Sequence, residues 1–461
     1  MPSAAASSVP FSQTQEDAAA HILHPFVDNF QLRQKGARVI SRAEGIYVWD
    51  ETGKRYLDAF AGLWCVNLGY GRQELIDAAS AQMATLPYYN LFFNTVTEPV
   101  AALAKMICHL APEAMNRVFF TTSGSEANDT AWRMIRRYWE LAGAPEKKIV
   151  IGRHNAYHGS TVAGVSLGGM KPMQQQGELS VADIEHICQP YWFGEGGDLS
   201  PAEFGLAAAR ALEEKILALG PENVAAFIAE PIQGAGGVII PPDTYWPEIQ
   251  RIVRQYDLLL VADEVICGFG RTGHWFGSQT LGIEPDLMSI AKGLSSGYLP
   301  IGRVVLNDRV ADVLTAKSAG EFLHGFTYSG HPVCAAVALE NLRILERELI
   351  VPRVREESGP YLACALGGLA EHPLVGEVRS CGLLAAIELV ENKITRRRYR
   401  GDRAGALCRE AALEAGLILR ATGDTMLLSP PLVITKAEID QLIGLTRIAL
   451  DATLEKLQQP I

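Results

Sequence analysis

The sequence predicts an α/β protein with a large domain built on a mostly parallel sheet and a small α+β domain built from both chain ends. Between residues 117 and 305, short continuous apolar runs alternate with segments of helical periodicity. Apolar strands separated by helices are typical of a parallel sheet that is covered on both faces. The 461 residues, 48% of them hydrophobic, can bury a large core, and this length favours more than one domain.

The N-terminal segments predict a leader followed by one part of the small domain. Residues 1–20 are predicted to be a flexible leader, because their first half is rich in Ala and Ser and lacks the pattern of a secretory signal. A short helix is expected over 18–23, where a proline soon ends it. Residues 21–70 are assigned to the small domain, and the alternation of apolar and polar residues over 36–60 predicts short antiparallel strands.

Residues 71–330 are predicted to form the large domain, and residues 331–461 are predicted to form the C-terminal part of the small domain. The large domain opens with two helical patterns, over 74–86 and 99–110. Six strands are predicted after them, over 117–121, 149–151, 224–228, 258–262, 287–290 and 301–306. The C-terminal part carries helical patterns near 333–348, 403–416 and 435–456.

Composition excludes several classes of function. The formal net charge is -11, and an acidic protein lacks the basic surface that nucleic acids require. The one cationic run, Arg396 to Arg400, is interpreted as a solvated surface segment. No apolar run approaches the roughly 20 residues that span a bilayer, so we expect no membrane contact. The eight cysteines are scattered without a CxxC pair, which favours free thiols and a cytoplasmic protein.

A Ser/Gly turn follows the first predicted strand of the large domain. In parallel sheets, ligands bind beyond the carboxyl ends of the strands. Ser123, Gly124 and Ser125 stand at such an end and open a helix, so free backbone N–H groups and the helix dipole favour a bound phosphate. Taken alone, the same turn is also a common helix N-cap.

The end of the second predicted strand carries Tyr157 and His158. An aromatic side chain at this position can stack on a flat ring, although it can also simply cover core. His154 and His158 have the i, i+4 spacing of some metal sites, but no third ligand lies near them in the sequence. We therefore expect no metal.

Two ionisable residues directly follow apolar strands. Asp263 follows the strand over 258–262, and a carboxylate is costly to bury there without a partner. It either caps the next turn or keeps a pyridine nitrogen protonated. Lys292 closes the strand over 287–290, where desolvation lowers the pKa of the amine and makes it a usable nucleophile for a carbonyl.

A phosphate turn, a stacking aromatic, a pyridinium partner and an aldehyde-trapping lysine are together the groups that pyridoxal 5'-phosphate (PLP) needs. No other common cofactor needs all four. The sequence therefore predicts a PLP enzyme in which Lys292 holds the cofactor covalently.

The chain resembles the class III (ω-amino acid) aminotransferases of the fold-type I PLP enzymes over nearly its whole length. Seven stretches carry the resemblance most specifically: Ser123–Asp129, Asn155–Ser160, Glu230–Gly234, Ala262–Val265, Gly268–Gly273, Lys292–Gly293 and Thr327–Pro332. Within the family it is most similar to the amine–pyruvate and putrescine (polyamine)–pyruvate transaminases, because of Ala61–Asn67 and Tyr88–Phe93.

The resemblance implies the roles of the catalytic and cofactor-binding residues. Lys292 would bind the PLP aldehyde and then move the proton, while Asp263 would pair with the pyridine nitrogen. Val265 and Tyr157 are expected on the two faces of the ring. The remaining residues expected at the cofactor are Ser123, Gly124, Ser125, His158, Glu230 and Thr327. Of these, Gly124 and Ser125 would bind the phosphate, and the partner subunit's Thr327 would complete that site, which implies a homodimer or a dimer of dimers.

The resemblance also implies a substrate pocket that accepts two kinds of substrate. Four aromatic side chains are expected to line it: Phe26, Trp64, Phe92 and Tyr157. Arg420 matches the family's mobile arginine, which binds a substrate carboxylate and swings aside for an amine. Glu230 matches a position that can pair with this arginine. A movable arginine suits both substrates, because a fixed buried cation would penalise the amine.

The expected reaction moves the amino group of an ω-amine or diamine, putrescine first, to pyruvate through pyridoxamine phosphate, giving alanine and an aldehyde or ketone. The donor stays open among putrescine, β-alanine, taurine-like ω-amino acids and 1-arylethylamines, because one methylene changes discrimination by only about 1–3 kcal/mol. A PLP aminomutase and a non-catalytic PLP-fold binding protein are the alternatives. A nicotinamide oxidoreductase is rejected, since Gly268–Gly273 lacks the βαβ context of a dinucleotide-binding loop.

Overall fold

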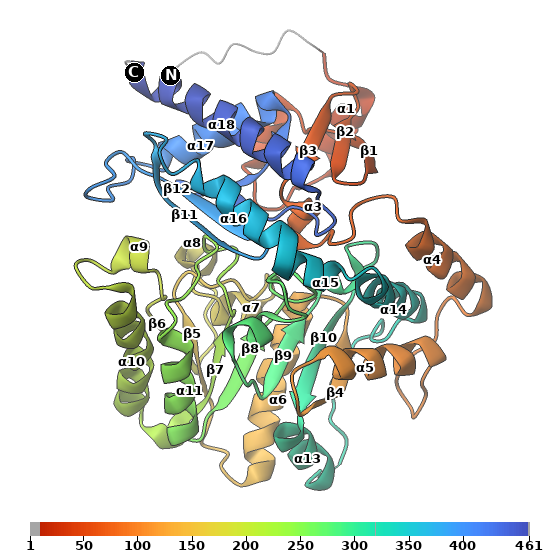
Figure 1. Ribbon diagram of the computed structural model, residues 1–461. Coiled ribbons are helices and arrows are strands. Elements are labelled where there is room, and N and C mark those ends of the chain that lie inside the picture. The colour runs from red at the N-terminus through yellow and green to blue at the C-terminus, as the bar shows by residue number, and fades with distance from the viewer. Residues whose placement is uncertain (1–9, 319, 460–461) are drawn as a thin grey trace.

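The computed structural model of the protein describes residues 10–318 and 320–459. A seven-stranded sheet flanked by helices fills the lower half of the molecule, and two four-stranded sheets with their helices form the upper half (Figure 1). The first and the last segments of the described chain both lie in the upper half (Figure 1). The fold is α/β, as the sequence predicts.

The seven-stranded sheet has the order β4-β10-β9-β8-β7-β5-β6. Its strands are β4 (Met115–Thr121), β5 (Ile149–Arg153), β6 (Ile184–Ile187), β7 (Val224–Ala229), β8 (Leu259–Asp263), β9 (Leu287–Ile290) and β10 (Gly302–Asn307). The β5–β6, β5–β7, β7–β8 and β8–β9 ladders are parallel, and only β10 runs antiparallel to its two neighbours. All six predicted strands are confirmed. The edge strand β6 was not predicted, because it is short and carries polar residues.

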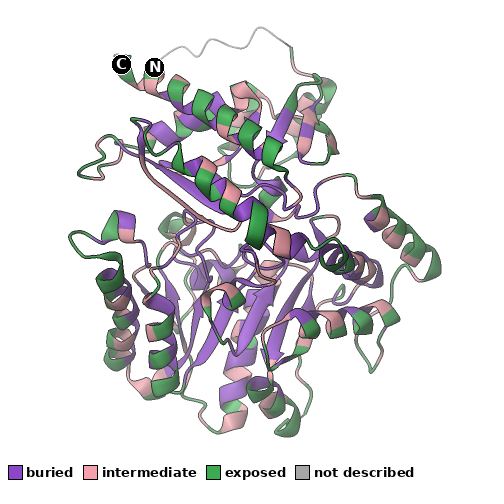
Figure 2. Cartoon of the chain, in the orientation of Figure 1, coloured by how far each residue is buried: buried purple, intermediate pink, exposed green. Residues whose placement is uncertain are grey.

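Both faces of this sheet are covered by helices. In β8 the side chain of Leu260 packs with α10 and α11, whereas that of Val261 packs with α6 and α13 on the other face. The strands are buried and the outer helix surfaces are exposed (Figure 2). The helices of this part are α4 (Gln73–Thr85), α5 (Glu98–Leu110), α6 (Gly124–Ala142), α7 (Val162–Leu167), α8 (Lys171–Gln175), α9 (Trp192–Glu195), α10 (Pro201–Leu219), η1 (Pro221–Asn223), α11 (Tyr245–Gln255), α12 (Gly277–Leu281), η2 (Lys292–Ser295), α13 (Asp308–Ala316) and α14 (Pro332–Arg347). Among the described residues, no helix has the length and apolarity needed to cross a membrane.

The upper half joins both ends of the chain. One sheet pairs β1 (Ile40–Glu44), β2 (Tyr47–Asp50) and β3 (Arg55–Asp58) as antiparallel neighbours and adds β13 (Leu417–Ile418) parallel to β3. The other has the order β11-β12-β15-β14, from β11 (Val375–Cys381), β12 (Leu384–Leu389), β14 (Arg420–Thr422) and β15 (Thr425–Leu428). The helices are α1 (Gln13–His21), α2 (Asn29–Lys35), α3 (Ala61–Trp64), α15 (Ile350–Arg353), η3 (Val354–Ser358), α16 (Gly359–Gly367), α17 (Arg403–Ala415) and α18 (Lys436–Gln458).

The N-terminal segment differs from the prediction. Helix α1 occupies Gln13–His21, whereas the sequence was read as a flexible leader over 1–20 with a helix over 18–23. The helix begins earlier because the Ser12 hydroxyl accepts a hydrogen bond from the backbone N–H of Gln15, whose side chain accepts one from the backbone of Ser12. Residues 1–9 of the predicted leader lie outside the described residues.

The interpretation of Arg396 to Arg400 as a solvated run is wrong for two of its members. Arg398 forms an ion pair with the fully buried side chain of Glu388, at 2.6 Å. The guanidinium of Arg396 stacks over Trp192, 4.3 Å from the ring centroid. Glu388 lies on the preceding strand β12 and Trp192 lies on the distant helix α9, and charge patterning alone could not reveal either contact.

The β3–β13 contact gives a prediction for stability. Leu417 is fully buried and pairs with Leu57, so Leu417→Ala leaves a cavity where the two chain ends meet. We expect the free energy of unfolding to fall by about 2–5 kcal/mol, measured by urea denaturation. Leu217→Ala, at a side chain that is 59% exposed, is the matched control and should change it by under about 0.5 kcal/mol. Equal losses in both variants would contradict the packing described.

Candidate active site

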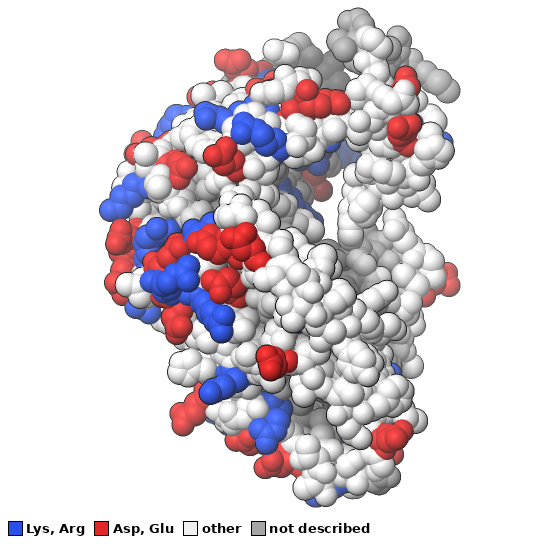
Figure 3. Space-filling model, turned by 90° about the vertical axis from the view of Figure 1, so that its right-hand side faces the viewer, with Lys and Arg blue, Asp and Glu red and all other residues white. Residues whose placement is uncertain are grey.

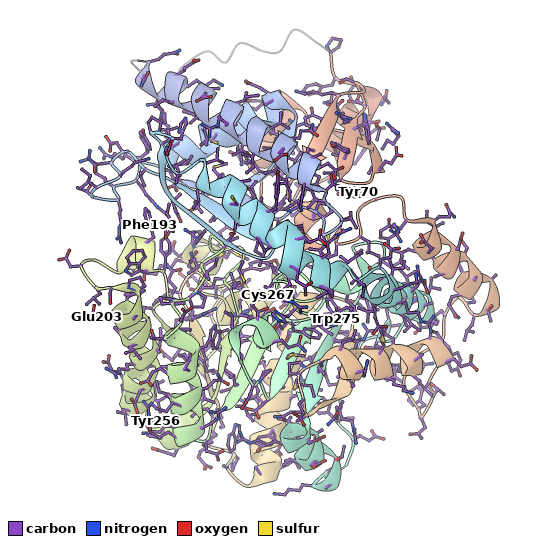
Figure 4. The ribbon with its side chains drawn as sticks, viewed as in Figure 1. Tyr70, Phe193, Glu203, Tyr256, Cys267 and Trp275 are labelled. Carbon is purple, nitrogen blue, oxygen red and sulfur yellow. The ribbon has the colours of Figure 1, made fainter. Side chains whose placement is uncertain are left out.

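A pocket lies at the carboxyl ends of the central strands, where the sheet faces the upper half of the molecule. Figure 4 labels Cys267, four residues after Asp263, at this junction. Loops and strand ends that are far apart in the sequence form the pocket walls. The lining residues are Gly124, Ser125, Asn128, Tyr157, His158, Gly159, Glu230, Asp263, Val265, Ile266, Ala291 and Lys292.

Lys292 lies in a strained and buried position. It begins η2 two residues after β9 ends, with φ of 43°, a backbone conformation that is uncommon for a residue with a side chain. Burial lowers the pKa of its amine, while the nearby carboxylate of Asp263 acts in the opposite direction. The Nζ atom is 5.6 Å from the centroid of the Trp64 ring.

The carboxylate of Asp263 is buried and held by three hydrogen bonds. Its Oδ2 accepts from Asn128 Nδ2 at 2.7 Å and lies 2.7 Å from His158 Nδ1, whose N–H donates because a carboxylate can only accept. Its Oδ1 accepts from the backbone N–H of Val265 at 3.1 Å. These donors compensate the carboxylate for its lost hydration and fix its direction at the end of β8.

The turn between β4 and α6 approaches its neighbours very closely. Ser123 is the N-cap of α6, and its hydroxyl accepts from the backbone N–H of Glu126. A Cβ atom on Gly124 would lie 2.9 Å from a methyl group of Val265. At Gly159, with φ of 133°, a Cβ would lie 2.7 Å from the hydroxyl of Ser125. The absence of a side chain at both glycines leaves this turn narrow. The first backbone N–H groups of the 19-residue helix α6 point out of its N-terminus, which suits an anion.

Tyr157 and Glu230 lie on the same side of the pocket. One carboxylate oxygen of the buried Glu230 accepts from the backbone N–H of Tyr157, and the other accepts from that of Gly234. Burial raises the pKa of Glu230. The Tyr157 ring meets the edge of Phe26 at 6.5 Å between centroids, although Phe26 itself is 72% exposed.

Arg420 and Lys292 lie against the same aromatic ring. The guanidinium of Arg420 is 5.2 Å from the centroid of Trp64, which is buried and has φ of 59°. Burial lowers the pKa of Arg420. Within residues 10–318 and 320–459, no ion pair joins Arg420 to Glu230, so the pairing that the resemblance allows is not formed here.

Thr327 and Phe92 lie outside the pocket of their own chain. The carbonyl of Thr327 accepts from the Tyr88 hydroxyl at 2.6 Å, and both residues are on the surface. Phe92 lies against Gly325 on the same surface. The other predicted cofactor residues come together around Lys292, apart from Ser123, which caps the helix beside the pocket.

Sequence reasoning missed Asn128. Its side-chain amide donates to both Asp263 and the carbonyl of His158, which links two of the loops that line the pocket. Its place one helical turn after Ser125 was the available signal, because i and i+3 lie on one face of a helix. His154 does not share a site with His158: its ring stacks on His186, 5.8 Å away.

The fold and the pocket define a class of protein. A family model described as aminotransferase class-III matches residues 31–450, and the chain belongs to this family. Class III aminotransferases are PLP-dependent enzymes of fold-type I.

Individual relatives narrow the comparison. The chain is 63% identical to a putrescine–pyruvate aminotransferase of Pseudomonas aeruginosa over 433 residues, which cover 94% of each protein. It is 42% identical to the mitochondrial gamma aminobutyrate transaminase 1 of Solanum lycopersicum, covering 95% of this chain and 86% of that protein. Among solved structures, an omega transaminase from Pseudomonas jessenii in complex with PMP has a TM-score of 0.95 and 44% identity, covering 96% of this chain and 99% of that one.

The lowered pKa of Lys292 can be tested in the cofactor-free enzyme. Burial disfavours the ammonium form, so the reactive free amine should persist to lower pH than in an ordinary lysine, whose pKa is 10.5. Acetylation by acetic anhydride, followed by mass spectrometry as a function of pH, should give a midpoint below that value, with the exposed Lys393 as internal reference. Asp263→Asn removes a charge that favours the ammonium and should lower the midpoint further. A midpoint at or above 10.5 would contradict the burial argument.

Proposed function

We propose that this protein transfers the amino group of putrescine, or of a related ω-amine or diamine, to pyruvate by a two-step (ping-pong) reaction with PLP. The observation that carries the proposal is the position of Trp64, against whose ring both the amine of Lys292, a pocket residue, and the guanidinium of Arg420 lie. The free amine of Lys292 suits the transfer of an amino group, and the guanidinium of Arg420 suits a carboxylate. The 63% identity to a putrescine–pyruvate aminotransferase supports the choice of substrates.

The residues of the pocket fit PLP. The open N-terminus of α6 at Gly124 and Ser125, with a wall of glycine at 159, would take the phosphate. The carboxylate of Asp263 would hold a protonated ring nitrogen, since opposite charges favour each other's charged forms. Val265 and Tyr157 would enclose the two faces of the ring. When bound, the cofactor supplies an aldehyde that accepts the amino group and a ring that delocalises negative charge.

Lys292 would both bind the cofactor and carry the proton. Its buried side chain favours the free amine, which is the form that attacks an aldehyde and accepts a proton. The strained backbone at φ 43° fixes where the side chain leaves the strand end. Lys292 and Asp263 line the same pocket, so the proposed base and the proposed partner of the ring nitrogen act on one cofactor.

Arg420 would bind the carboxylate of pyruvate. A guanidinium over an indole ring is stabilised without an anion, so Arg420 can keep its charge when the substrate carries no carboxylate. A carboxylate that enters then finds an unengaged, planar set of donors. The indole ring of Trp64 and the edges of Tyr157 and Phe26 would contact the hydrocarbon part of the donor.

The reaction itself is tested by one assay. Enzyme, PLP, putrescine and pyruvate should yield alanine, detected by chromatography, and a panel of amine donors should rank putrescine above β-alanine and 1-arylethylamines. Isomerisation of the donor without alanine would instead indicate an aminomutase. Binding of PLP with no reaction of any donor would indicate a non-catalytic protein.

Lys292→Ala should abolish alanine formation and the near-visible absorbance of the lysine-bound cofactor, while the protein remains folded and keeps some PLP affinity. The matched control is Lys147→Ala, since Lys147 is also partly buried, donating to the carbonyls of Tyr256 and Asp257, but lies away from the pocket. That variant should retain near-normal turnover. Near-normal turnover in Lys292→Ala would overturn the assigned role.

The proposed enzyme is a homodimer in which each subunit completes the other's site. Large apolar side chains are exposed on segments that contact each other or the pocket: Phe26, Tyr88, Phe92, Phe93, Leu323 and Tyr328. Seen from the side of α4 and α5, a broad area of the surface carries almost no charged residues (Figure 3). Exposed apolar side chains on a surface with few charges are typical of an interface. The exposed Thr327 would then reach the phosphate site of the other subunit. The free state of all eight cysteines supports a cytoplasmic location.

The dimer predicts a specific effect of charge on the apolar surface. Phe93 is 89% exposed, and Phe93→Arg should shift the protein from dimer to monomer in light scattering and reduce activity at least tenfold. Ile394, which is 94% exposed on a different loop, provides the control Ile394→Arg, which should remain dimeric and active. A monomeric and fully active wild-type protein would contradict the shared site.

A further inference from the structure

A cluster of charged side chains around β12 is not used by the chemistry above. Its centre is Glu388 on β12, whose side chain is fully buried. One carboxylate oxygen accepts from the Tyr191 hydroxyl at 2.6 Å and from Arg379 at 2.7 Å. The other accepts from Arg398 at 2.6 Å and from the Thr425 hydroxyl at 2.9 Å. With Glu377, which pairs with Arg379, the cluster has two positive and two negative charges.

The cluster joins segments from both halves of the molecule. Arg379 on β11 donates through Nε to the carbonyl of Val238 at 2.7 Å and through a terminal nitrogen to the carbonyl of Gly237. Both carbonyls belong to a short hairpin, bridged between Gln233 and Ile239, that follows Glu230 in the pocket. The charged network therefore fixes the β11–β12 sheet to the same loop that carries a pocket carboxylate.

A second connection comes from the segment around α9. Arg396 lies 5.3 Å from the ring centroid of Phe193, which Figure 4 labels on α9 beneath the tip of the β11–β12 sheet. Arg398, two residues later, bonds to Tyr191 at 2.6 Å. Arg396 and Arg398 thus hold the loop after β12 against the segment around α9, which belongs to the half of the molecule with the seven-stranded sheet.

The same cluster reaches the strand that carries Arg420. Thr425 on β15 is the direct partner of Thr422 on β14, and Arg420 begins that three-residue strand. The hydroxyl of Thr422 donates to the carbonyl of Ala235, in the hairpin that Arg379 holds. The short edge strand β14 is therefore fixed at Thr422, both by this hydrogen bond and by pairing with Thr425. Thr422 is two residues from Arg420.

The guanidinium of Arg420 has no charged partner to place it. Across the described residues 10–318 and 320–459, its guanidinium lies over the face of Trp64, which holds a cation without paired hydrogen bonds. The position of the charge therefore depends on where the backbone of β14 lies. A carboxylate site loses affinity when its donors move, because paired hydrogen bonds need correct geometry.

We propose that the Glu388 cluster, acting through Thr425 and β14, positions Arg420 for the substrate carboxylate and so sets the preference for carboxylate-bearing over carboxylate-free substrates. Buried ion pairs of this kind often add little net stability, and positional specificity is one reason to retain them. Thr425 is a positioning residue in this scheme and contacts no substrate. The inference rests on the proposed role of Arg420.

The test removes one hydroxyl from the cluster. Thr425→Val keeps the shape of the side chain and loses its hydrogen bonds to Glu388 and Arg398. We expect the KM for pyruvate to rise about three- to tenfold, the loss expected when one hydrogen bond between Arg420 and the carboxylate is weakened, with kcat and the KM for putrescine changed less than about twofold. Thr425→Ser restores the hydroxyl and should return the KM for pyruvate to near the wild-type value.

Three controls separate positioning from general damage. Thr446→Val makes the same change at another fully buried threonine, whose hydroxyl bonds to its own helix at Leu442, and should leave both KM values unaltered. In an Arg420→Leu background, Thr425→Val should have no further effect on pyruvate, because its effect passes through the arginine. Calorimetric binding of propionate, with propionamide as the uncharged probe, should weaken in Thr425→Val for the acid alone.

The outcomes that overturn the proposal are distinct from a failure of the transaminase function. Equal increases in the KM for pyruvate and for putrescine, or an undiminished effect in the Arg420→Leu background, would show a general structural role. Unchanged propionate affinity would also overturn it. The propionate measurement needs no turnover, so it remains informative if the enzyme makes no alanine.

Discussion

The amine of Lys292 and the carboxylate of Asp263 are buried in the same pocket, and burying two ionisable groups is costly unless the surrounding fold supplies partners for them. Neighbouring parallel strands bring them together, because Asp263 on β8 pairs with Ser289 on β9, three residues before the lysine. A buried carboxylate needs donors, which come from Asn128, His158 and the backbone of Val265. Asn128 and His158 lie on a helix and a loop that follow two other strands, β4 and β5. The ionisable pair is therefore stabilised only when several distant segments are in register.

The strained residues of the site depend on the same framework. Lys292 and Trp64 both have positive φ, a conformation that costs free energy unless the surroundings determine it. Each is adjacent to packed structure: the first follows a fully buried strand, and the second packs on Phe60 at 4.2 Å between ring centroids. The apolar layers of the α/β core thus supply the stability that holds two unfavourable backbone conformations at the pocket.

Sequence patterns could predict whatever depends on local periodicity or on the ends of strands. The apolar runs located six strands of the large sheet, and strand ends gave Asp263 and Lys292, which line the same pocket. Contacts that depend on how a loop folds back were not predicted. Arg398 lies in the loop after β12 and forms an ion pair with Glu388 on that strand, and spacing along the chain does not reveal this contact. Helix α1 was placed too late, because its start depends on one capping box and not on apolar periodicity. The position of Thr327 on the surface has a functional meaning only if a second chain is considered.

A pocket for two unlike substrates poses a conflict between charge and burial. A guanidinium paired with a buried carboxylate would have its charge compensated already and would bind pyruvate poorly. A buried guanidinium without any partner would cost free energy whenever the amine substrate is bound. The face of Trp64 resolves the conflict, because an aromatic quadrupole stabilises the cation without competing for its N–H donors. Glu230 is meanwhile engaged with the backbone of Tyr157 and Gly234 and so does not capture the arginine. In the proposed function, the aromatic and not acidic neighbour of Arg420 leaves its guanidinium available to a carboxylate.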